Sequence, residues 1–418
     1  MTIRTCKVRC WHSCFCVALL VASAVGVVVA SKVFSMVSPL APARPYLTEK
    51  LLGTKYNNVV FATTHNSYAV FGQFSAANHF GSIQNSLNQG VRALMLDVHW
   101  SDHTSDGIAI CHSRCSQGSV RVDEILGLIA TFLDNHPVNV ITIMWEIVCS
   151  KQQEDCDALK HAVYRIIERS QLADMLYVPT NASPADGLTP TRVALGDRWP
   201  TLQKMVDNNE RIVMFFDKSS DKSSFDRPSH LELWDHVIET SYSNNDHNAL
   251  DAECKFHRGS PDNPGKMLLN NHFTHLGLLP VSLITMGYNT NPYMYNRMVR
   301  CQHELGKPIT NFISVDHWWY SDVVNTAACL NGEHDAETCK SGNTVRTVFK
   351  VAISIMGGGI GILAIHVCLK LYRRLSNTGE ILLGHRFMQE VPTAAGPESD
   401  PAAVPGHHGL LFVGAVCT

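Results

Sequence analysis

The sequence is poor in charged residues and has no excess of positive charge. Asp, Glu, Lys and Arg make up 17% of its 418 residues, below the roughly 25% that is usual for soluble proteins. Lys and Arg number 34 against 37 acidic residues, which gives a formal net charge of -3. This near-neutral balance argues against nucleic acid or another polyanion as the main partner. The composition also excludes a disordered chain, a collagen and a coiled coil.

Several motifs that identify an enzyme class directly are missing. The chain has neither an HExxH motif nor paired CxxC motifs, which argues against a zinc site. No glycine-rich phosphate loop follows the first expected strand. Cysteine, by contrast, is plentiful: 14 residues are many for a cytosolic enzyme and are typical of an oxidising compartment.

An apolar segment near each end of the chain accounts for part of the low charge. Residues 1–30 combine Arg4, Lys7 and Arg9 with the apolar run 15–30, a pattern typical of a secretory signal cleaved before residue 31. A retained signal anchor is the alternative interpretation. The N-terminal run is slightly short for a membrane span, which favours cleavage.

The second apolar segment predicts a transmembrane helix at 350–370. Residues 351–369 carry no formal charge, and Lys370, Arg373 and Arg374 follow directly, which is a stop-transfer pattern. The tail 371–418 is rich in Ala, Pro and Gly and is expected to be cytosolic and disordered. The sequence therefore predicts a single-pass type I membrane protein whose middle region, 31–349, is extracellular or luminal.

The middle region contains an even number of cysteines. They are Cys111, Cys115, Cys149, Cys156, Cys254, Cys301, Cys329 and Cys339. An even count in an oxidising compartment predicts up to four disulfides, but the sequence leaves their pairing open.

Short β-branched or apolar runs alternate with stretches of helical periodicity through the middle region. The expected strands are 58–64, 91–99, 107–112, 138–146, 211–217, 267–272, 283–288 and 311–316, and the expected helices include 122–135, 157–176, 231–242 and 292–305. Strand followed by helix, repeated about eight times, predicts a TIM-type (β/α)8 barrel of the α/β class. A doubly wound open sheet is the alternative, but the missing phosphate loop disfavours it.

Polar side chains occur at the carboxyl ends of six expected strands. They lie in 64–66, 97–99, 111–112, 145–146, 217–218 and 315–317. In a barrel these ends meet at one rim, where functional side chains are found. Two imidazoles on such a rim can act as general base and general acid. Asn66, Asp97 and Glu146 are oxygen donors that suit Ca²⁺ or Mg²⁺. The set is suited to phosphoryl transfer.

The motifs resemble those of a known family. Residues 62–68 (ATTHNSY), 90–97 (GVRALMLD) and 111–113 (CHS) resemble the X region of phosphatidylinositol-specific phospholipases C. Residues 199–205, 271–273 and 311–316 narrow the resemblance to eukaryotic PLC-like phosphodiesterases that contain this X domain. The similarity covers approximately residues 50 to 330.

The resemblance implies specific roles for the rim residues. His65 corresponds to the base that deprotonates the inositol 2-hydroxyl, and Asp316 to the residue that orients it. His112 corresponds to the acid that protonates the leaving diacylglycerol oxygen. Arg92 and Lys218 are candidates for substrate binding, although Arg92 also suits a purely structural role beneath its strand and Lys218 a solvated pair with Asp217.

The resemblance does not decide whether a calcium ion is bound. In the calcium-dependent relatives an Asn and three acids hold Ca²⁺; Asn66, Asp97 and Glu146 match three of these ligands, but Met95 stands at the fourth position. Either a weak calcium site completed by water or no metal at all follows from this set.

Two classes of function remain. The first is a membrane-tethered phosphoric diester hydrolase that cleaves a phosphoinositide-like phospholipid or a glycosyl-phosphatidylinositol anchor. The second is a catalytically silent barrel that binds lipid headgroups or a protein partner, an interpretation favoured by Met95, His317 and Trp318. A glycerophosphodiester-type hydrolase lacks support, because those enzymes have a His-Arg-Gly motif where this chain has 65–67 (HNS).

Overall fold

The computed structural model describes most of the middle region of the chain. The described residues are 49–112, 114–149, 153–179, 195–217, 229–242, 250–252, 254–261, 263–274, 288–334, 337 and 339. The expected signal (1–30), transmembrane helix (350–370) and tail (371–418) lie outside them. Of the helices within the described part, none combines the length and the apolarity needed to cross a membrane.

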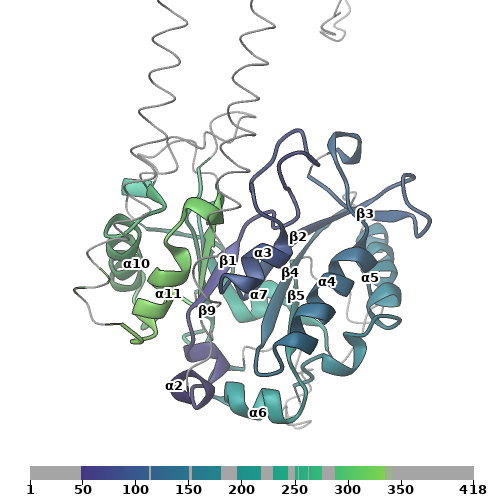
Figure 1. Ribbon diagram of the computed structural model, residues 1–418. Helices are drawn as coiled ribbons and strands as arrows, with labels where there is room; N and C mark the ends of the chain where they lie inside the picture. Colours follow the sequence, from purple (N-terminus) through teal and green to yellow (C-terminus); the bar gives the residue numbers. More distant parts are fainter. Residues whose placement is uncertain are drawn as a thin grey trace, which may run out of the picture. The chain divides into compact units, whose positions relative to one another are not determined.

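Eight parallel strands follow one another around a curled sheet (Figure 1). They are β1 Phe61–Thr64, β2 Ala93–Trp100, β4 Ile141–Val148, β5 Ile212–Phe216, β6 Leu231–Glu232, β7 Val237–Thr240, β9 Met267–Asn271 and β10 Phe312–Val315. Their order in the sheet is β6-β5-β4-β2-β1-β10-β9-β7, so the first strand pairs with the last. This order is consistent with a TIM-like barrel, whereas a doubly wound sheet reverses direction beside a central first strand.

The barrel is incompletely closed. Among the described strands, β6 and β7 do not pair with each other. Two antiparallel strands make the sheet mixed: β3 Ile108–Ile110 pairs with β2, and β8 Phe256–Arg258 pairs with β7. The described chain thus forms a curled mixed sheet with the strand order of a barrel.

Two expected elements need correction. The strand expected at 107–112 exists, but it forms a hairpin with β2 outside the barrel path. The helix expected at 231–242 is wrong: the segment forms β6, the one-turn helix α7 Leu233–His236, and β7. Helical periodicity was misleading there because almost the whole segment is buried, so no polar face marks a period. The strand expected at 283–288 lies outside the described residues apart from Tyr288.

Helices cover the outside of the sheet. They are α2 Glu49–Leu52, α3 Ile83–Asn88, α4 Val122–Asn135, α5 Gln153–Ile167, α6 Leu202–Asp207, α10 Tyr293–Glu304 and α11 Val323–Leu330, with 3-10 turns η2 Tyr56–Asn58, η3 Cys115–Gln117, η4 Ala173–Met175, η7 Gly196–Arg198 and η8 Trp318–Tyr320. Helices α3, α4 and α5 pack over β2, β4 and β5, whereas α10 and α11 cover β1 and β10 (Figure 1).

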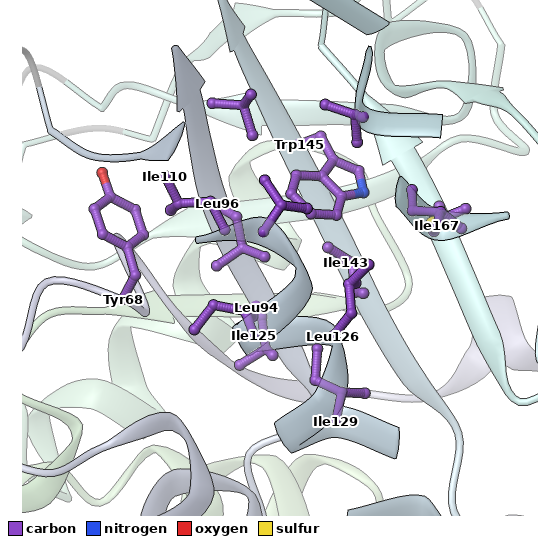
Figure 2. Close-up of a cluster of buried hydrophobic side chains, with 14 of the residues drawn as sticks. Tyr68, Leu94, Leu96, Ile110, Ile125, Leu126, Ile129, Ile143, Trp145 and Ile167 are labelled. Carbon is purple, nitrogen blue, oxygen red and sulfur yellow. The ribbon is translucent and has the colours of Figure 1, made fainter. Parts of the chain in front are cut away.

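The two faces of the strands bury separate apolar clusters. Leu94 and Leu96 of β2 and Trp145 of β4 face the helices, where Figure 2 shows them against Leu126 and Ile129 of α4. The alternate residues face the barrel interior and form a second cluster that includes Phe61, Phe215, Leu269 and Phe312. We call the end of the sheet interior at the carboxyl ends of the strands the barrel mouth. Because successive side chains of a strand point to opposite faces, the interior packing fixes which residues point into this mouth.

Candidate active site at the barrel mouth

The closing pair of strands brings His65 and Asp316 together. Thr64 of β1 is in register with Val315 of β10, and His65 N donates to the Val315 carbonyl at 3.0 Å. The next residues of both strands therefore meet, and His65 Nδ1 lies 2.9 Å from Asp316 Oδ1. The His65 ring stacks on Phe273, with centroids 3.9 Å apart and planes inclined by 4°. Side chains 251 residues apart thus form one rigid pair.

Two loops, one after β1 and one before α10, support this pair. Asn78 Nδ2 donates to the same Asp316 Oδ1 at 2.9 Å, and Asn289 Nδ2 donates to the Asp316 backbone carbonyl at 2.7 Å. Burial lowers the pKa of His79 to about 4, so His79 is neutral and its Nε2 donates to the His65 carbonyl at 2.6 Å. Asn78, Asn289 and His79 were not predicted from the sequence, because each belongs to a loop without periodicity.

The pair is electrostatically complementary. Burial lowers the pKa of His65, but the charge of Asp316 and the hydrogen bond to it outweigh this effect, and the net pKa is raised. Burial likewise raises the pKa of Asp316, but the His65 charge and hydrogen bond overcome it and hold the pKa at about 2. Asp316 is therefore ionised at neutral pH and stabilises the imidazolium of His65.

A second histidine lies beside a second carboxylate. His112 Nδ1 is 3.4 Å from Asp97 Oδ2, which also accepts from the Tyr68 hydroxyl at 2.9 Å. The Cys111–Cys115 disulfide closes the short loop that carries His112. The His112 side chain is 43% exposed, against 15% for His65, so His112 meets solvent more openly.

Asn66 follows His65 in the chain, and its side chain contacts the second pair. Its backbone has φ 46°, a left-handed conformation that Asn tolerates better than most residues. One end of its amide faces both Asp97 oxygens at 3.2 and 3.3 Å, where the nitrogen donates. The other end lies 3.3 Å from His112 Nδ1 and 3.4 Å from Asn78 Oδ1. Ser67 holds this turn against β2: its N donates to the Met95 carbonyl, and its Oγ accepts from Met95 N.

Three carboxylates lie side by side at the carboxyl ends of the adjacent strands β2, β4 and β5. Asp97 of β2 is in register with Glu146 of β4, and Asp217 follows directly after β5 with its Oδ1 accepting from Ile147 N at 2.8 Å. Desolvation, followed by the charges of Asp97 and Asp217, raises the pKa of Glu146 to about 7. This mutual repulsion is what a bound divalent cation would relieve.

The oxygen set fits a hard cation only in part. Asp97 and Glu146 provide suitable oxygens, but the Asn66 amide turns its nitrogen towards Asp97. The Met95 side chain packs on the interior cluster, and its Sδ accepts from Ser314 Oγ at 3.1 Å. Within the described residues no group of three or more His, Cys, Asp or Glu side chains is arranged as a metal site.

Of the two candidate substrate-binding residues, Arg92 lies away from this set. Arg92 is buried at the start of β2, opposite the mouth, where it donates to Asn139 Oδ1 and to the Leu87 and Val91 carbonyls. Its guanidinium also lies 4.8 Å from the ring centroid of Phe132. These contacts match the structural role and exclude Arg92 from the mouth. Lys218 lies outside the described residues.

Two further charged residues of the mouth were missed. Glu239 of β7 is completely buried and pairs with Arg258 of β8. Glu239 was expected in the helix 231–242, and no element was expected at β8. An acid within an apolar run is the sequence signal for this position.

The strand order and the two histidine–carboxylate pairs define a protein of the PLC-like phosphodiesterase fold. Residues 51–331 match the PI-PLC X 1 family. The chain belongs to this family, which confirms the resemblance seen in its motifs.

Relatives are found among fungal, plant and bacterial proteins. The chain is 27% identical over 289 residues to PI-PLC X domain-containing protein 1 of Arthroderma benhamiae, covering 66% of this chain and 86% of the fungal protein. It is 23% identical over 295 residues to a PI-PLC X domain-containing protein of Arabidopsis thaliana, covering 66% of this chain and 61% of the plant protein.

Solved bacterial structures show weaker likeness. The phosphatidylinositol-specific phospholipase C of Listeria monocytogenes has a TM-score of 0.45 at 14% identity, over 69% of this chain and 100% of the bacterial one. A calcium-dependent phosphoinositol-specific phospholipase C from a Pseudomonas species has a TM-score of 0.27 at 18% identity, over 42% and 62%. Residue roles in this chain are therefore argued from its own geometry.

Proposed function

We propose that this protein is a membrane-tethered phosphoric diester hydrolase of the phosphatidylinositol phospholipase C type. Its substrate is a phosphoinositide-like phospholipid or a glycosyl-phosphatidylinositol anchor. The observation that carries the proposal is the presence of two histidine–carboxylate pairs, His65–Asp316 and His112–Asp97, with Asn66, the residue after His65, beside the second pair.

His65 acts as the general base. Its Nδ1 is held by Asp316, so Nε2 is the atom that takes the proton from the headgroup 2-hydroxyl. The hydroxyl oxygen then attacks phosphorus and forms a cyclic phosphodiester. Asp316 stabilises the imidazolium as it forms, and Asn78 keeps the carboxylate in position.

His112 acts as the general acid. As the bond between phosphorus and the diacylglycerol oxygen breaks, protonated His112 gives its proton to that oxygen. The neutral imidazole then removes a proton from water, which opens the cyclic phosphate, while His65 returns its proton to the departing 2-hydroxyl oxygen. Each histidine ends in its starting state, so the protons balance over the two steps.

A calcium ion, if it takes part, would be held by Asp97, Glu146 and, once its amide turns its oxygen to the ion, Asn66, and would stabilise charge on the phosphate oxygens. Removal of calcium with a chelator separates a metal-assisted enzyme, whose rate falls, from one that depends on protein groups alone.

The disulfides support an extracellular or luminal location for the barrel. Four pairs form: Cys111–Cys115, Cys149–Cys156, Cys254–Cys301 and Cys329–Cys339. They use all eight cysteines of the middle region, and such pairs persist in oxidising compartments. This location suits action on lipids of the outer or luminal leaflet.

Histidine substitutions test the proposal. We expect the full-length chain to release a cyclic inositol phosphate from phosphatidylinositol vesicles, and His65→Ala and His112→Ala each to lower kcat by about a hundredfold or more. The exposed His103, which lies outside both pairs, provides the control His103→Ala. Absence of product from every phosphodiester tested, with and without calcium, would refute the hydrolase.

A silent headgroup-binding barrel is the second candidate. The observation that favours it is Met95, whose packed side chain occupies the position of a metal-binding acid in the resembling enzymes. Headgroup binding by the wild-type chain, with turnover at background, would establish it.

A further inference from the structure

The Cys111–Cys115 disulfide encloses the proposed general acid. Its cysteines are four positions apart, and His112 directly follows the first of them. The side-chain contacts of His112 are long, because its Nδ1 lies 3.4 Å from Asp97 Oδ2 and 3.3 Å from the Asn66 amide. Hydrogen bonds of this length are weak. Cys111 N donates to the Asp97 carbonyl at 3.1 Å, so the bond to Cys115 fixes the other end of the segment that carries His112.

The rest of this loop is attached without the help of the disulfide. Ile110 and Val120 exchange two backbone hydrogen bonds at its base, of 2.9 and 3.0 Å. Further along, Ser75 N donates to the Gln117 carbonyl at 2.9 Å. Opening of the disulfide would therefore release the segment around His112 and leave both ends of the loop in place.

One sulfur of this disulfide is accessible from solvent. Cys111 is fully buried, whereas Cys115 is half-buried at the start of η3. Two other disulfides join cysteines that are all buried; they are Cys254–Cys301 and Cys329–Cys339. Because a thiolate must reach a sulfur in order to exchange with a disulfide, these two bonds are protected and Cys111–Cys115 is open to attack at Cys115.

Charge distinguishes the two disulfides that have an accessible sulfur. Cys149–Cys156 is the second of them, since Cys149 is half-buried. Residues 149–157 carry one lysine and three acids, whereas residues 111–115 carry one arginine, one histidine and no acid. Positive charge stabilises both the thiolate that attacks and the thiolate that leaves, and negative charge opposes both. Exchange with an anionic thiol is therefore favoured at residues 111–115.

We propose that Cys111–Cys115 is a thiol–disulfide exchange site that takes a small anionic thiol of the glutathione class and thereby controls the general acid. The inference rests on the proposed hydrolase and adds a regulation of the same site. Reduction frees the segment around His112, so protonation of the leaving oxygen slows, and oxidation restores it.

The exchange proceeds in two steps. The thiolate of the first thiol attacks Cys115 Sγ, the disulfide bond breaks, and its electron pair leaves on Cys111 Sγ, which takes a proton from solvent. The thiolate of a second thiol then attacks the sulfur of the first thiol in the mixed disulfide, and Cys115 leaves as a thiolate and is protonated. The protein gains two electrons and two protons, and two thiols become one small disulfide.

A redox titration of the full-length chain tests the exchange site. The chain is equilibrated with defined ratios of reduced to oxidised glutathione, free thiols are alkylated with N-ethylmaleimide, and the labelled cysteines are located by mass spectrometry. Among the eight cysteines of the four disulfides, we expect Cys111 and Cys115 to be labelled first. Earlier labelling of any other pair would overturn the site.

Turnover of phosphatidylinositol vesicles by the same samples tests the regulation. As Cys111–Cys115 is reduced, kcat should fall about tenfold or more with a smaller change in KM, and it should recover on oxidation. The control, Cys149→Ser with Cys156→Ser, should keep this response. Cys111→Ser with Cys115→Ser should have low activity at every glutathione ratio. Wild-type turnover that is independent of the ratio overturns the regulation and leaves the hydrolase standing.

The chemical reactivity of His112 separates this inference from the hydrolase itself. After alkylation of the thiols, histidines are modified with diethyl pyrocarbonate and located by mass spectrometry. The His112 side chain is 43% exposed, so its rate of modification should rise about twofold on reduction as the segment becomes free. The exposed His103 is the internal control and should react at an unchanged rate. Early labelling of Cys111 and Cys115 together with this rise supports the inference even if no lipid is hydrolysed, and an unchanged rate at His112 overturns it.

Discussion

The two mouth histidines differ in environment although each faces a carboxylate. His65 is enclosed between Phe273 and Asp316, and its carboxylate partner accepts from both His65 and Asn78. His112 lies at 3.4 Å from Asp97 on a more exposed loop. A tightly held imidazole beside an ionised carboxylate is suited to receive a proton, and a more exposed one is suited to exchange protons with water.

The pH profile should report the His65–Asp316 pair. His65 must be neutral to act as base, so activity should rise as the pH increases through its pKa. Because Asp316 raises that pKa above its ordinary value of 6.5, the acidic limb of the profile should lie above 6.5. Asp316→Asn removes the charge, so the limb should move to lower pH while kcat falls by about a hundredfold or more.

Profiles of kcat/KM against pH for the wild type and Asp316→Asn measure this shift. Asp123→Asn, at an exposed carboxylate on α4, is the control and should keep the wild-type profile. An acidic limb that stays in place in Asp316→Asn would show that another group controls it.

At the scale of elements, the disulfides Cys111–Cys115 and Cys149–Cys156 constrain different segments of the chain. Cys111–Cys115 closes the loop that carries His112, whereas Cys149–Cys156 joins the end of β4 to α5 and encloses none of the proposed catalytic residues. Both loops are short, so each bond should contribute a similar, modest stability of about 2–3 kcal/mol by loop-closure entropy.

Double serine variants should therefore separate activity from stability. Cys111→Ser with Cys115→Ser should lower kcat because His112 loses its fixed position, while Cys149→Ser with Cys156→Ser should retain it. Urea unfolding and turnover of both variants measure the two effects. Equal activity in the two variants would show that the disulfide does not position His112.

Some elements could be predicted from the sequence pattern alone, and others could not. The helix expected at 122–135 is confirmed as α4 Val122–Asn135, because one apolar face and one solvated face give a clear period. The segment 231–242 lacks such contrast, since β6 and β7 are buried on both sides. Asn78 and Arg258 could not be predicted as site residues, because only the tertiary contacts of a loop and of an antiparallel strand bring them to the mouth.

For the molecule as a whole, the sequence predicted six of the eight parallel strands and their ends but not β6 and β7, and it placed His65, Asp316, His112 and Asp97 at one edge of the sheet. It did not predict that the facing edges of the described strands β6 and β7 are unpaired. That pairing depends on how many residues of each strand can form backbone hydrogen bonds with the other. Of the carboxylates at this edge, only Glu239 was not predicted, because its segment was expected to be a helix.

The interior apolar layer should carry much of the barrel's stability. Phe61 and Phe312, from the first and last strands, are fully buried with ring centroids 5.6 Å apart. Phe61→Ala should lower the free energy of unfolding by about 3–5 kcal/mol, because it leaves a cavity between β1 and β10. Val138→Ala, at an exposed site, is the control and should change stability by about 0.5 kcal/mol or less in urea titrations.

The pairing of β1 with β10 also has a consequence for how the protein matures. Contacts between consecutive strands can form as the chain emerges, but this pairing must wait for residues about 250 positions apart to meet, which is the slow, non-local part of folding. His65 and Asp316 sit on those two strands. A nascent or truncated chain that ends before β10 therefore holds the first histidine without its carboxylate, and hydrolytic competence would appear only when synthesis of the domain is complete.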